Sequence, residues 1–237
     1  MIKCGKLFGT GVGPGDPELL TLKAVRVINE ADVIFTAAST KNKYSVALET
    51  ARPHISKSAV TRSLSFPMTK DKDVMEAGWY KNAIEIADVL KQGKNAVFLT
   101  LGDPTTYSTF GYILRGLKKV MPDAEIETIP GITSFHAAAA RLNRILVEAE
   151  ESLLVTSGAY GGENLEKIAE NTKNLVIMKA YKNIKGINEA LRETGFYDKS
   201  VAVSRCGRKD EKITENLDEL EKKAPDYWTL ILASRRK

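Results

Sequence analysis

The fold of this chain is constrained most strongly by an apolar run that leads into a Gly-Asp-Pro turn. Residues 96–99 (Ala-Val-Phe-Leu) are followed by Gly102, Asp103 and Pro104, and then by a helical pattern. The apolar run predicts a buried strand. The carboxyl end of such a strand is where open α/β sheets bind ligands. We therefore expect a sheet with a candidate binding loop at residues 101–110.

The residues of this loop have clear chemical uses. Gly102 allows a ligand to approach the backbone closely, and Pro104 stiffens the turn. Asp103 offers a hydrogen-bond acceptor at the end of the strand. The aromatic Tyr107 is surrounded by four hydroxyl groups, those of Thr105, Thr106, Ser108 and Thr109. The same residues suit a capped turn between a strand and a helix, so this segment alone leaves both interpretations open.

A second loop, near the amino terminus, is rich in glycine but does not have nucleotide-binding spacing. Counting from Gly9 or from Gly11, the sixth residue is Pro14 or Asp16, so neither register gives G-x-G-x-x-G. The phosphate-binding pattern G-x-x-x-x-G-K-[ST] is absent from the sequence as well. Pro14 and a second proline three residues later predict a rigid, exposed loop, and Asp16 suits the cap of the next helix.

A third segment with the same strand–turn–helix character covers residues 129–135 (Ile-Pro-Gly-Ile-Thr-Ser-Phe). Either Thr133 or Ser134 is expected to cap a helix over 135–142, because capping is the usual role of a hydroxyl at this position. The other hydroxyl remains a candidate for binding a ligand.

Strand and helix patterns alternate along the whole chain, which predicts an α/β fold. The stretch 142–151 interrupts this alternation and is interpreted as a connection. We predict two α/β domains, residues 1–144 and 145–237, with a ligand cleft between them. The expected strands are 7–12, 32–37, 59–66, 95–101, 125–130, 152–157, 174–180, 200–205, 212–215 and 227–233. The expected helices are 18–29, 74–91, 112–120, 135–142, 162–171, 184–194 and 217–223.

Composition restricts the class of protein. Of the 237 residues, 43% are hydrophobic and 27% charged, which is ordinary for a globular protein, and no apolar run reaches the length of a membrane span. The first residues lack a signal-peptide pattern, so a cytoplasmic location is expected. Two cysteines and two histidines, without an acidic cluster in ligand spacing, predict no metal site. The net charge of +5 suits an acidic small molecule without deciding the partner, and no nucleic-acid-binding motif is present.

Six motifs together resemble one family. In chain order they are 11–23 (Gly-Val-Gly-Pro-Gly-Asp-Pro-Glu-Leu-Leu-Thr-Leu-Lys), 66–69 (Phe-Pro-Met-Thr), 101–109, 130–135, 176–179 (Val-Ile-Met-Lys) and 204–207 (Ser-Arg-Cys-Gly). The ordered set resembles the tetrapyrrole methylase superfamily, the class III S-adenosylmethionine-dependent methyltransferases. Within it, the chain is most similar to the branch that methylates C-20 of precorrin-2 or of cobalt-factor II in cobalamin biosynthesis. The likeness covers nearly the whole chain.

The resemblance implies a fold, a cofactor and partners. Members of the superfamily have two α/β domains, form homodimers, use S-adenosyl-L-methionine as methyl donor and, in this branch, act on a tetrapyrrole. Neither nucleic acid nor a membrane is expected as a partner. Carried over motif by motif, the expected cofactor contacts are Pro14, Gly102, Asp103, Thr106, Tyr107, Ser108, Thr133, Ser134, Met178, Lys179, Ala180 and Gly207.

No catalytic residue is assigned from the sequence. The resemblance places an aspartate just after the second strand in the uroporphyrinogen branch, whereas residues 35–39 here are Phe-Thr-Ala-Ala-Ser. This difference disfavours uroporphyrinogen as substrate and suits an electron-rich meso carbon, which attacks a sulfonium methyl group without a strong base. Arg205 is expected either to meet a substrate carboxylate or to pair with Asp210 or Glu211.

Other functions are compatible with the same motifs. A class III methyltransferase that modifies the translation-factor histidine (diphthine synthase) or an rRNA ribose would share the cofactor loops, although residues 107–109 fit these enzymes less well. A non-enzymatic nucleotide-binding protein would use the glycine-rich loop alone. Comparing the binding of S-adenosylhomocysteine, ATP and NAD separates this last class from a methyltransferase.

Overall fold

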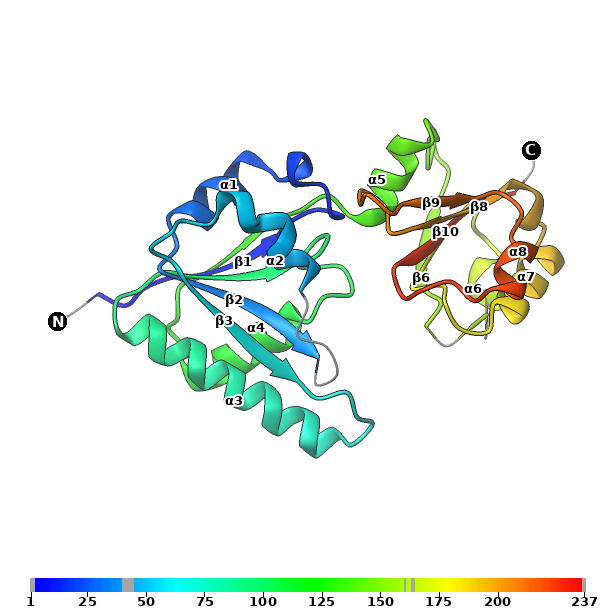
Figure 1. Ribbon diagram of the computed structural model, residues 1–237. Coiled ribbons are helices and arrows are strands. Elements are labelled where there is room, and N and C mark those ends of the chain that lie inside the picture. Colours follow the sequence, from blue (N-terminus) through cyan, green and yellow to red (C-terminus); the bar gives the residue numbers. More distant parts are fainter. Residues whose placement is uncertain (1–2, 40–44, 160, 163–164, 236–237) are drawn as a thin grey trace. The chain divides into compact units, whose positions relative to one another are not determined.

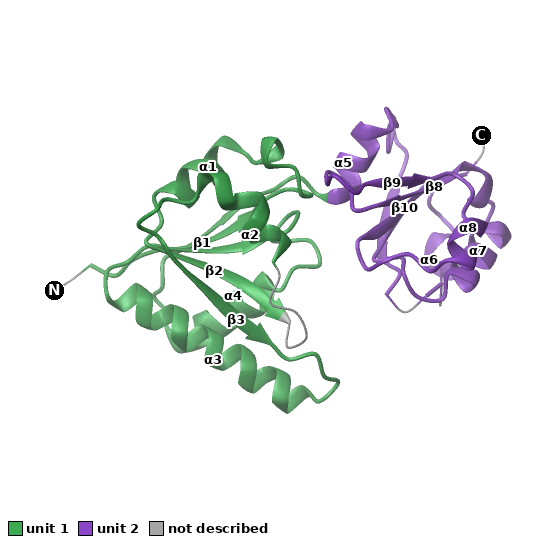
Figure 2. Ribbon diagram, in the orientation of Figure 1, with its two compact units in different colours: residues 1–133 green, residues 134–237 purple. Residues whose placement is uncertain are grey.

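The computed structural model describes residues 3–39, 45–159, 161–162 and 165–235. The chain forms two compact units, residues 1–133 and 134–237, each built on its own five-stranded sheet (Figures 1 and 2). The predicted α/β class is confirmed. Within the described residues, no helix combines the length and the hydropathy that crossing a membrane requires.

The sheet of the first unit is parallel throughout. β1 lies between β4 and β5, with Leu7 opposite both Ala96 and Ile126. Because parallel strands run in one direction, the loops that follow β1, β4 and β5 leave the same edge of the sheet side by side. The strands, β1 (Leu7–Gly11), β2 (Val33–Ser39), β3 (Val60–Phe66), β4 (Ala96–Thr100) and β5 (Ile126–Ile129), have the order β3-β2-β4-β1-β5.

Helices cover both faces of this sheet (Figure 1). Val97 and Leu99 share a core with α1 and α2, whereas Ala96 and Phe98 share the opposite core with α3 and α4. Alternate residues of β4 therefore enter opposite cores, which explains why the strand is one continuous apolar run. The helices are α1 (Leu22–Asn29), α2 (Val46–Ala51), α3 (Lys72–Lys91) and α4 (Phe110–Val120).

The sheet of the second unit is mixed. β10 is antiparallel to both of its neighbours, β7 and β8, so the residues that precede β10 lie beside those that follow β7 and β8. The helices α6, α7 and α8 share one core with the sheet, and α5 packs against β10. The strands are β6 (Leu153–Ser157), β7 (Asn174–Met178), β8 (Ser200–Ser204), β9 (Lys212–Thr214) and β10 (Thr229–Ser234), in the order β6-β7-β10-β8-β9. The helices are α5 (Ser134–Arg141), α6 (Leu165–Ala169), α7 (Ile184–Glu193) and α8 (Asp218–Lys222).

The division between the units falls at 133/134, upstream of the predicted domain boundary at 144/145. Because α5 packs against β10, it belongs to the second unit. Arg144, in the predicted connection, donates to the carbonyl oxygen of Leu232 at 3.3 Å, to that of Lys199 at 2.8 Å and to Ser234 Oγ at 3.0 Å. An interruption in the alternation predicts a connection, but it does not predict on which sheet the preceding helix packs.

The expected helix 18–29 is two elements, the 3-10 helix η1 (Pro17–Leu19) and α1. Asp16 caps η1, as one interpretation of this residue predicts, and Thr21 caps α1 through a 3.2 Å hydrogen bond from the amide of Ala24. Since each helix has its own N-cap, two capping residues this close together separate two helices.

Three other differences concern short elements. The expected strand 227–233 begins only at Thr229, because Asp226 turns the chain by accepting a hydrogen bond from the amide of Trp228 at 3.0 Å. The expected helix 162–171 is described as α6 over 165–169, and residues 163–164 lie outside the described part. The sequence patterns do not predict α2, which is too short for a full amphipathic pattern, or the 3-10 helices η2 (Arg52–His54) and η3 (Tyr197–Lys199).

Candidate functional site

Three loops of the first unit meet where β1, β4 and β5 end, and their backbones are in contact. Gly102 donates to the carbonyl oxygen of Gly13 at 2.7 Å, and Gly13 donates to that of Gly102 at 3.3 Å. A Cβ atom on Gly11 would lie 2.5 Å from the Gly102 oxygen, and one on Gly131 would lie 2.2 Å from the same atom. These two positions therefore require glycine. We call Gly11, Gly13, Gly102, Asp103 and Gly131 the loop junction.

Asp103 links two of the three loops. Its Oδ1 atom accepts hydrogen bonds from the amide of Thr105 at 2.8 Å and from the Thr105 hydroxyl. Its Oδ2 atom accepts from the amide of Gly131 at 3.0 Å. The residue is only 9% exposed. Asp103 is thus an acceptor at the strand end, and it positions the loop after β4 beside the loop after β5. Direct contact between Asp103 and a cofactor stays a prediction.

Gly102 has an environment unlike that of Gly11 and Gly131. Its φ of +72° lies in the left-handed region, and a Cβ atom there would meet no atom within 4 Å. The α-carbon therefore faces open space rather than packed protein. A ligand can approach the backbone at this position, and a side chain would occupy the space that the ligand needs.

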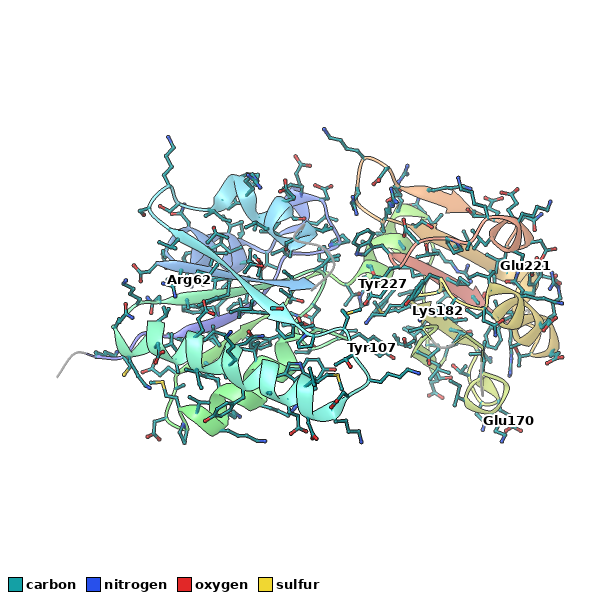
Figure 3. The ribbon with its side chains drawn as sticks, turned by 60° about the horizontal axis from the view of Figure 1, so that its bottom comes forward. Arg62, Tyr107, Glu170, Lys182, Glu221 and Tyr227 are labelled. Carbon is teal, nitrogen blue, oxygen red and sulfur yellow. The ribbon has the colours of Figure 1, made fainter. Side chains whose placement is uncertain are left out.

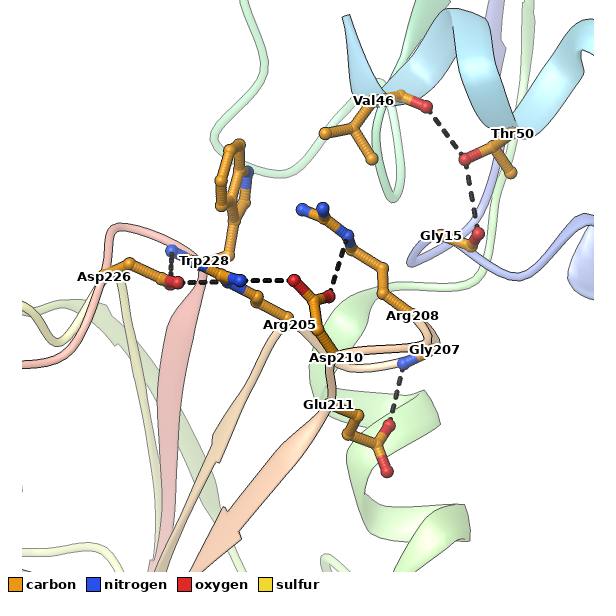
Figure 4. A network of polar contacts seen from close by, with 10 residues as sticks. All are labelled: Gly15, Val46, Thr50, Arg205, Gly207, Arg208, Asp210, Glu211, Asp226 and Trp228. Carbon is orange, nitrogen blue, oxygen red and sulfur yellow. Dashed lines mark hydrogen bonds and ion pairs between the residues drawn. The ribbon is translucent and has the colours of Figure 1, made fainter.

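The glycine-rich loop is held against the rest of the first unit. Thr50 Oγ1, on α2, lies 3.4 Å from the carbonyl oxygen of Gly15 and 2.9 Å from that of Val46 (Figure 4). Pro14 is buried, so the expectation of an exposed loop is wrong at this residue. This support is not visible in the sequence pattern, because α2 is too short to be predicted from it.

The other candidates on the loop after β4 are ordered by local contacts. Ser108 Oγ accepts a hydrogen bond at 3.1 Å from the amide of Phe110, the first residue of α4, and lies 2.8 Å from the hydroxyl oxygen of Thr100 at the end of β4. Thr106 lies in the turn and donates its amide to the Asp103 carbonyl oxygen at 3.4 Å. Tyr107 is 47% exposed (Figure 3), and its φ of +49° is uncommon for a residue other than glycine. Backbone strain of this kind clusters at functional sites, which keeps Tyr107 a candidate.

The third loop ends at the boundary between the units. Because α5 begins at Ser134, Thr133 occupies the position of its N-cap. Thr133 is the last residue of the first unit, Ser134 is the first of the second, and both are half-buried. Contact of either hydroxyl with a cofactor stays a prediction.

In the second unit, Met178, Lys179 and Ala180 lie at the carboxyl end of β7. Ala180 is buried and donates its amide to the carbonyl oxygen of Thr229 at 2.8 Å, which ties this strand end to the start of β10. Lys179 has a φ of +56°, a conformation that costs a non-glycine residue on the order of 1–3 kcal/mol. The strain makes this strand end a candidate binding position.

Arg205 and Gly207 follow β8 and also have positive φ angles, +55° and +74°. Arg205 forms ion pairs with Asp210 and Asp226 (Figure 4). Pairing with Asp210 was one of the expected alternatives, whereas Glu211 instead accepts a 2.8 Å hydrogen bond from the amide of Gly207. The carboxylates of Asp226 and Asp210 raise the pKa of Arg205 and occupy its guanidinium group.

Sequence reasoning missed three residues near this strand end. Arg208 lies over the ring of Trp228, with its guanidinium carbon 5.0 Å from the ring centroid, and Tyr227 precedes Trp228. The expected strand 227–233 included both aromatic residues, and neither was named as a binding residue. The signal that would have found them is Asp226, because an aspartate before aromatic residues favours a turn that exposes them.

Cys206, between Arg205 and Gly207, is buried. Burial, with the Glu211 carboxylate as a further cause, raises the pKa of its thiol to about 12. At pH 8 only about one such thiol in ten thousand is ionised, and the thiolate is the reactive form. We expect a chromogenic disulfide reagent at pH 8 to modify exposed Cys4 quickly and Cys206 only on unfolding. The Cys4→Ser variant leaves Cys206 as the sole thiol, and fast reaction of this folded variant contradicts the prediction.

A metal centre is not formed by the described residues, because no three of their His, Cys, Asp or Glu side chains are grouped to hold an ion. Comparison with known proteins relates this chain to a family. Residues 6–221 match the family model described as Tetrapyrrole (Corrin/Porphyrin) Methylases. The chain belongs to this family. The resemblance inferred from the ordered motifs is confirmed.

Two curated relatives of this tetrapyrrole methylase align over nearly its whole length. A Methanocaldococcus jannaschii protein named probable cobalt-precorrin-2 C(20)-methyltransferase is 38% identical over 236 residues, which are 98% of this chain and 97% of the relative. A Sinorhizobium protein named precorrin-2 C(20)-methyltransferase is 31% identical over 240 residues, which are 96% of this chain and 94% of the relative. Both names belong to the branch that the motifs indicated.

Two solved structures share the fold of this tetrapyrrole methylase. The cobalt precorrin-4 methyltransferase CbiF has a TM-score of 0.77 and 23% identity, over 97% of this chain and 94% of CbiF. Uroporphyrin-III C-methyltransferase from Thermus thermophilus, complexed with S-adenosyl homocysteine, has a TM-score of 0.68 and 22% identity, over 96% of this chain and 97% of that one. At these identities the likeness establishes the fold alone.

Proposed function

We propose that this tetrapyrrole methylase transfers a methyl group from S-adenosylmethionine to C-20 of precorrin-2 or of cobalt-factor II in cobalamin biosynthesis. The observation that carries the proposal is the loop junction, where three backbones meet and Gly102 faces open space at the sheet edge that binds ligands in α/β folds. The names of the relatives support the substrate. The Thermus thermophilus complex with S-adenosyl homocysteine supports the cofactor.

The residues of the loop junction fit the proposed cofactor. The space beside the Gly102 α-carbon is one that a Cβ atom would fill, and no atom lies within 4 Å of the position of that Cβ. We propose as cofactor contacts the twelve residues that the family resemblance indicates. In the first unit these are Pro14, Gly102, Asp103, Thr106, Tyr107, Ser108 and Thr133, and in the second they are Ser134, Met178, Lys179, Ala180 and Gly207.

In this proposal the protein contributes binding and orientation. S-adenosylmethionine, when bound, supplies a methyl group that its sulfonium already activates. Holding two reactants in line and excluding water lowers a barrier by roughly 7–11 kcal/mol, and the tightly packed loop junction provides the necessary rigidity. Both carboxylate oxygens of Asp103 accept hydrogen bonds, so Asp103 holds the loops in place rather than removing a proton. An electron-rich meso carbon needs no strong base, and we assign none.

We also propose that the protein is a homodimer. The support is the family resemblance together with the frequency of twofold homodimers among soluble oligomers. Light scattering during size-exclusion chromatography is expected to give twice the mass of one chain, and a single-chain mass at micromolar concentration contradicts the proposal.

The function is tested by offering labelled S-adenosylmethionine with three substrates: uroporphyrinogen, precorrin-2 and its cobalt form. We expect one methyl group at C-20 of precorrin-2, of the cobalt form, or of both, and none on uroporphyrinogen. Comparing the methylation rates of precorrin-2 and of its cobalt form in parallel assays shows which of the two is the preferred substrate. Methylation of uroporphyrinogen alone, or of none of the three, contradicts the proposed substrate. Calorimetry completes the test, because S-adenosylhomocysteine should bind while ATP and NAD should not.

A further inference from the structure

A group of aromatic and basic side chains lies at one edge of the second sheet. Tyr181 and Tyr227 have ring centroids 5.4 Å apart, and Tyr227 and Trp228 have centroids 6.4 Å apart. Lys182 Nζ lies 5.3 Å from the centroid of Tyr181, and the Arg208 guanidinium lies 5.0 Å from that of Trp228. Figure 3 labels Lys182 and Tyr227 in this region. We call these five residues the aromatic–cation cluster.

Sheet topology brings the aromatic–cation cluster together from three loops. Residues 181–182 follow β7, Arg208 follows β8, and 227–228 precede β10, the antiparallel strand between the other two. Tyr227 is 45% exposed and Trp228 is 36% exposed, so these rings do not fill the core. Tyrosine, tryptophan and arginine are the residues most enriched at energetically important contacts. Their convergence from three loops is therefore typical of a binding surface.

The basic groups of this surface are not fully compensated. Arg205 is held by Asp210 and Asp226, so its guanidinium is already paired. Arg208 shares Asp210 through a longer 3.5 Å contact from its Nε atom, and its buried Nη1 atom has no hydrogen-bond partner. The Arg208 side chain as a whole is 20% exposed, so a ligand carboxylate can reach the guanidinium beside this weak contact and form a charge-assisted hydrogen bond with it.

We infer that the aromatic–cation cluster binds a polycarboxylate tetrapyrrole, with Tyr227 against the face of the macrocycle and Arg208, held over the Trp228 ring, on one of its carboxylates. The rings of Tyr227 and Trp228 are at 82° to each other, so a flat ligand stacks on only one of them. The inference rests on the proposed function and specifies how that substrate is recognised. A flat conjugated ring stacks on an aromatic side chain. A guanidinium group can donate two parallel hydrogen bonds to one carboxylate. Arg208 and Lys182 bring two positive charges to the cluster, which suit a ligand that carries several carboxylates. The charge of the cluster therefore favours the tetrapyrrole as its ligand.

The test uses uroporphyrin, a stable polycarboxylate tetrapyrrole, and the porphyrin in which every carboxylate has been converted to a carboxamide. Fluorescence titration measures the Kd of both for the full chain. We expect Arg208→Met to raise the Kd for uroporphyrin at least tenfold and to change that of the amide less than twofold. Tyr227→Leu should weaken both porphyrins several-fold, because the ring face is common to them. Lys209→Met, which removes an exposed neighbouring charge, is the matched control and should change neither more than twofold.

Further arms separate recognition from folding and from cofactor binding. Arg208→Lys keeps the positive charge but loses the planar guanidinium group, so it should bind uroporphyrin with an affinity between those of the unmodified protein and Arg208→Met. If Arg208→Met does not fold, Arg208→Lys tests whether the guanidinium binds a carboxylate. The affinity for S-adenosylhomocysteine should stay within twofold of the unmodified protein in the Arg208 and Lys209 variants. Equal uroporphyrin affinity in Arg208→Met and Lys209→Met overturns the inference, as does a parallel loss of S-adenosylhomocysteine binding. If the unmodified protein binds no S-adenosylhomocysteine while the Arg208 effects hold, the proposed function fails and the carboxylate site stands.

Discussion

Gly131→Ala is expected to destabilise the first unit by about 3 kcal/mol, as overpacking of a closed core position does. The new Cβ atom would lie 2.2 Å from the Gly102 carbonyl oxygen and 2.8 Å from the Gly11 carbonyl carbon. Both neighbours are backbone atoms at the ends of buried strands, so neither can rotate away as a flexible side chain would. The loops after β1, β4 and β5 would have to separate, which would also disrupt the proposed cofactor site.

Gly102→Ala is the matched control. It adds the same methyl group to the loop junction, but at a position where the new Cβ atom meets no other atom within 4 Å. Its cost is the left-handed backbone conformation, about 1–2 kcal/mol for an L-residue. This variant should therefore stay folded yet lose at least tenfold in affinity for S-adenosylhomocysteine. The fluorescence of Trp79 on α3 reports unfolding of the first unit. The Trp228→Phe background removes the fluorescence of the other tryptophan. Urea unfolding in that background gives the stability, and a Gly131→Ala variant as stable as the Gly102→Ala variant contradicts the prediction.

Asp103→Ala is expected to lower both stability and cofactor affinity. The change leaves the amides of Thr105 and Gly131 without their acceptor, and the loss of two hydrogen bonds to a charged carboxylate at partly buried positions costs about 1–3 kcal/mol. Once the loops after β4 and β5 are no longer linked, S-adenosylhomocysteine affinity should fall at least tenfold. Asp103→Asn keeps the shape and one acceptor oxygen but cannot accept at both positions, so its losses should be intermediate. Urea unfolding and calorimetric titration measure the two effects.

Asp71→Ala separates bridging from ordinary capping. Asp71 caps α3 by accepting hydrogen bonds from the amides of Asp73 at 3.0 Å and Val74 at 3.3 Å, and α3 lies away from the loop junction in sequence. Its loss should cost about 1 kcal/mol of stability, the usual value for an N-cap, and leave cofactor affinity unchanged. If Asp103→Ala behaves in the same way as Asp71→Ala, then Asp103 is a cap and not a bridge.

The sequence predicted those features of the site that depend on neighbours along the chain. The apolar run 96–99 predicted β4, and the turn residues after it predicted a loop at the carboxyl end. The order of the motifs predicted the family. The missed elements are short ones: α2 is six residues long, and its Thr50 supports the glycine-rich loop. A segment of this length has less than two helical turns, so its apolar periodicity is not recognisable.

The sequence by itself determined the α/β class, the buried strands and the three glycine loops, because strand periodicity, turn residues and capping residues act locally. Only the tertiary structure decided that β1 lies between β4 and β5, which brings Gly11, Gly102 and Gly131 into backbone contact. It alone decided that β10 enters the second sheet in the antiparallel direction and places Trp228 beside Arg208. The physical reason is that strand pairing joins residues far apart in the chain. The free energy of strand pairing depends on how whole sheets and helices pack, and the pattern of neighbouring residues in the sequence does not describe that packing.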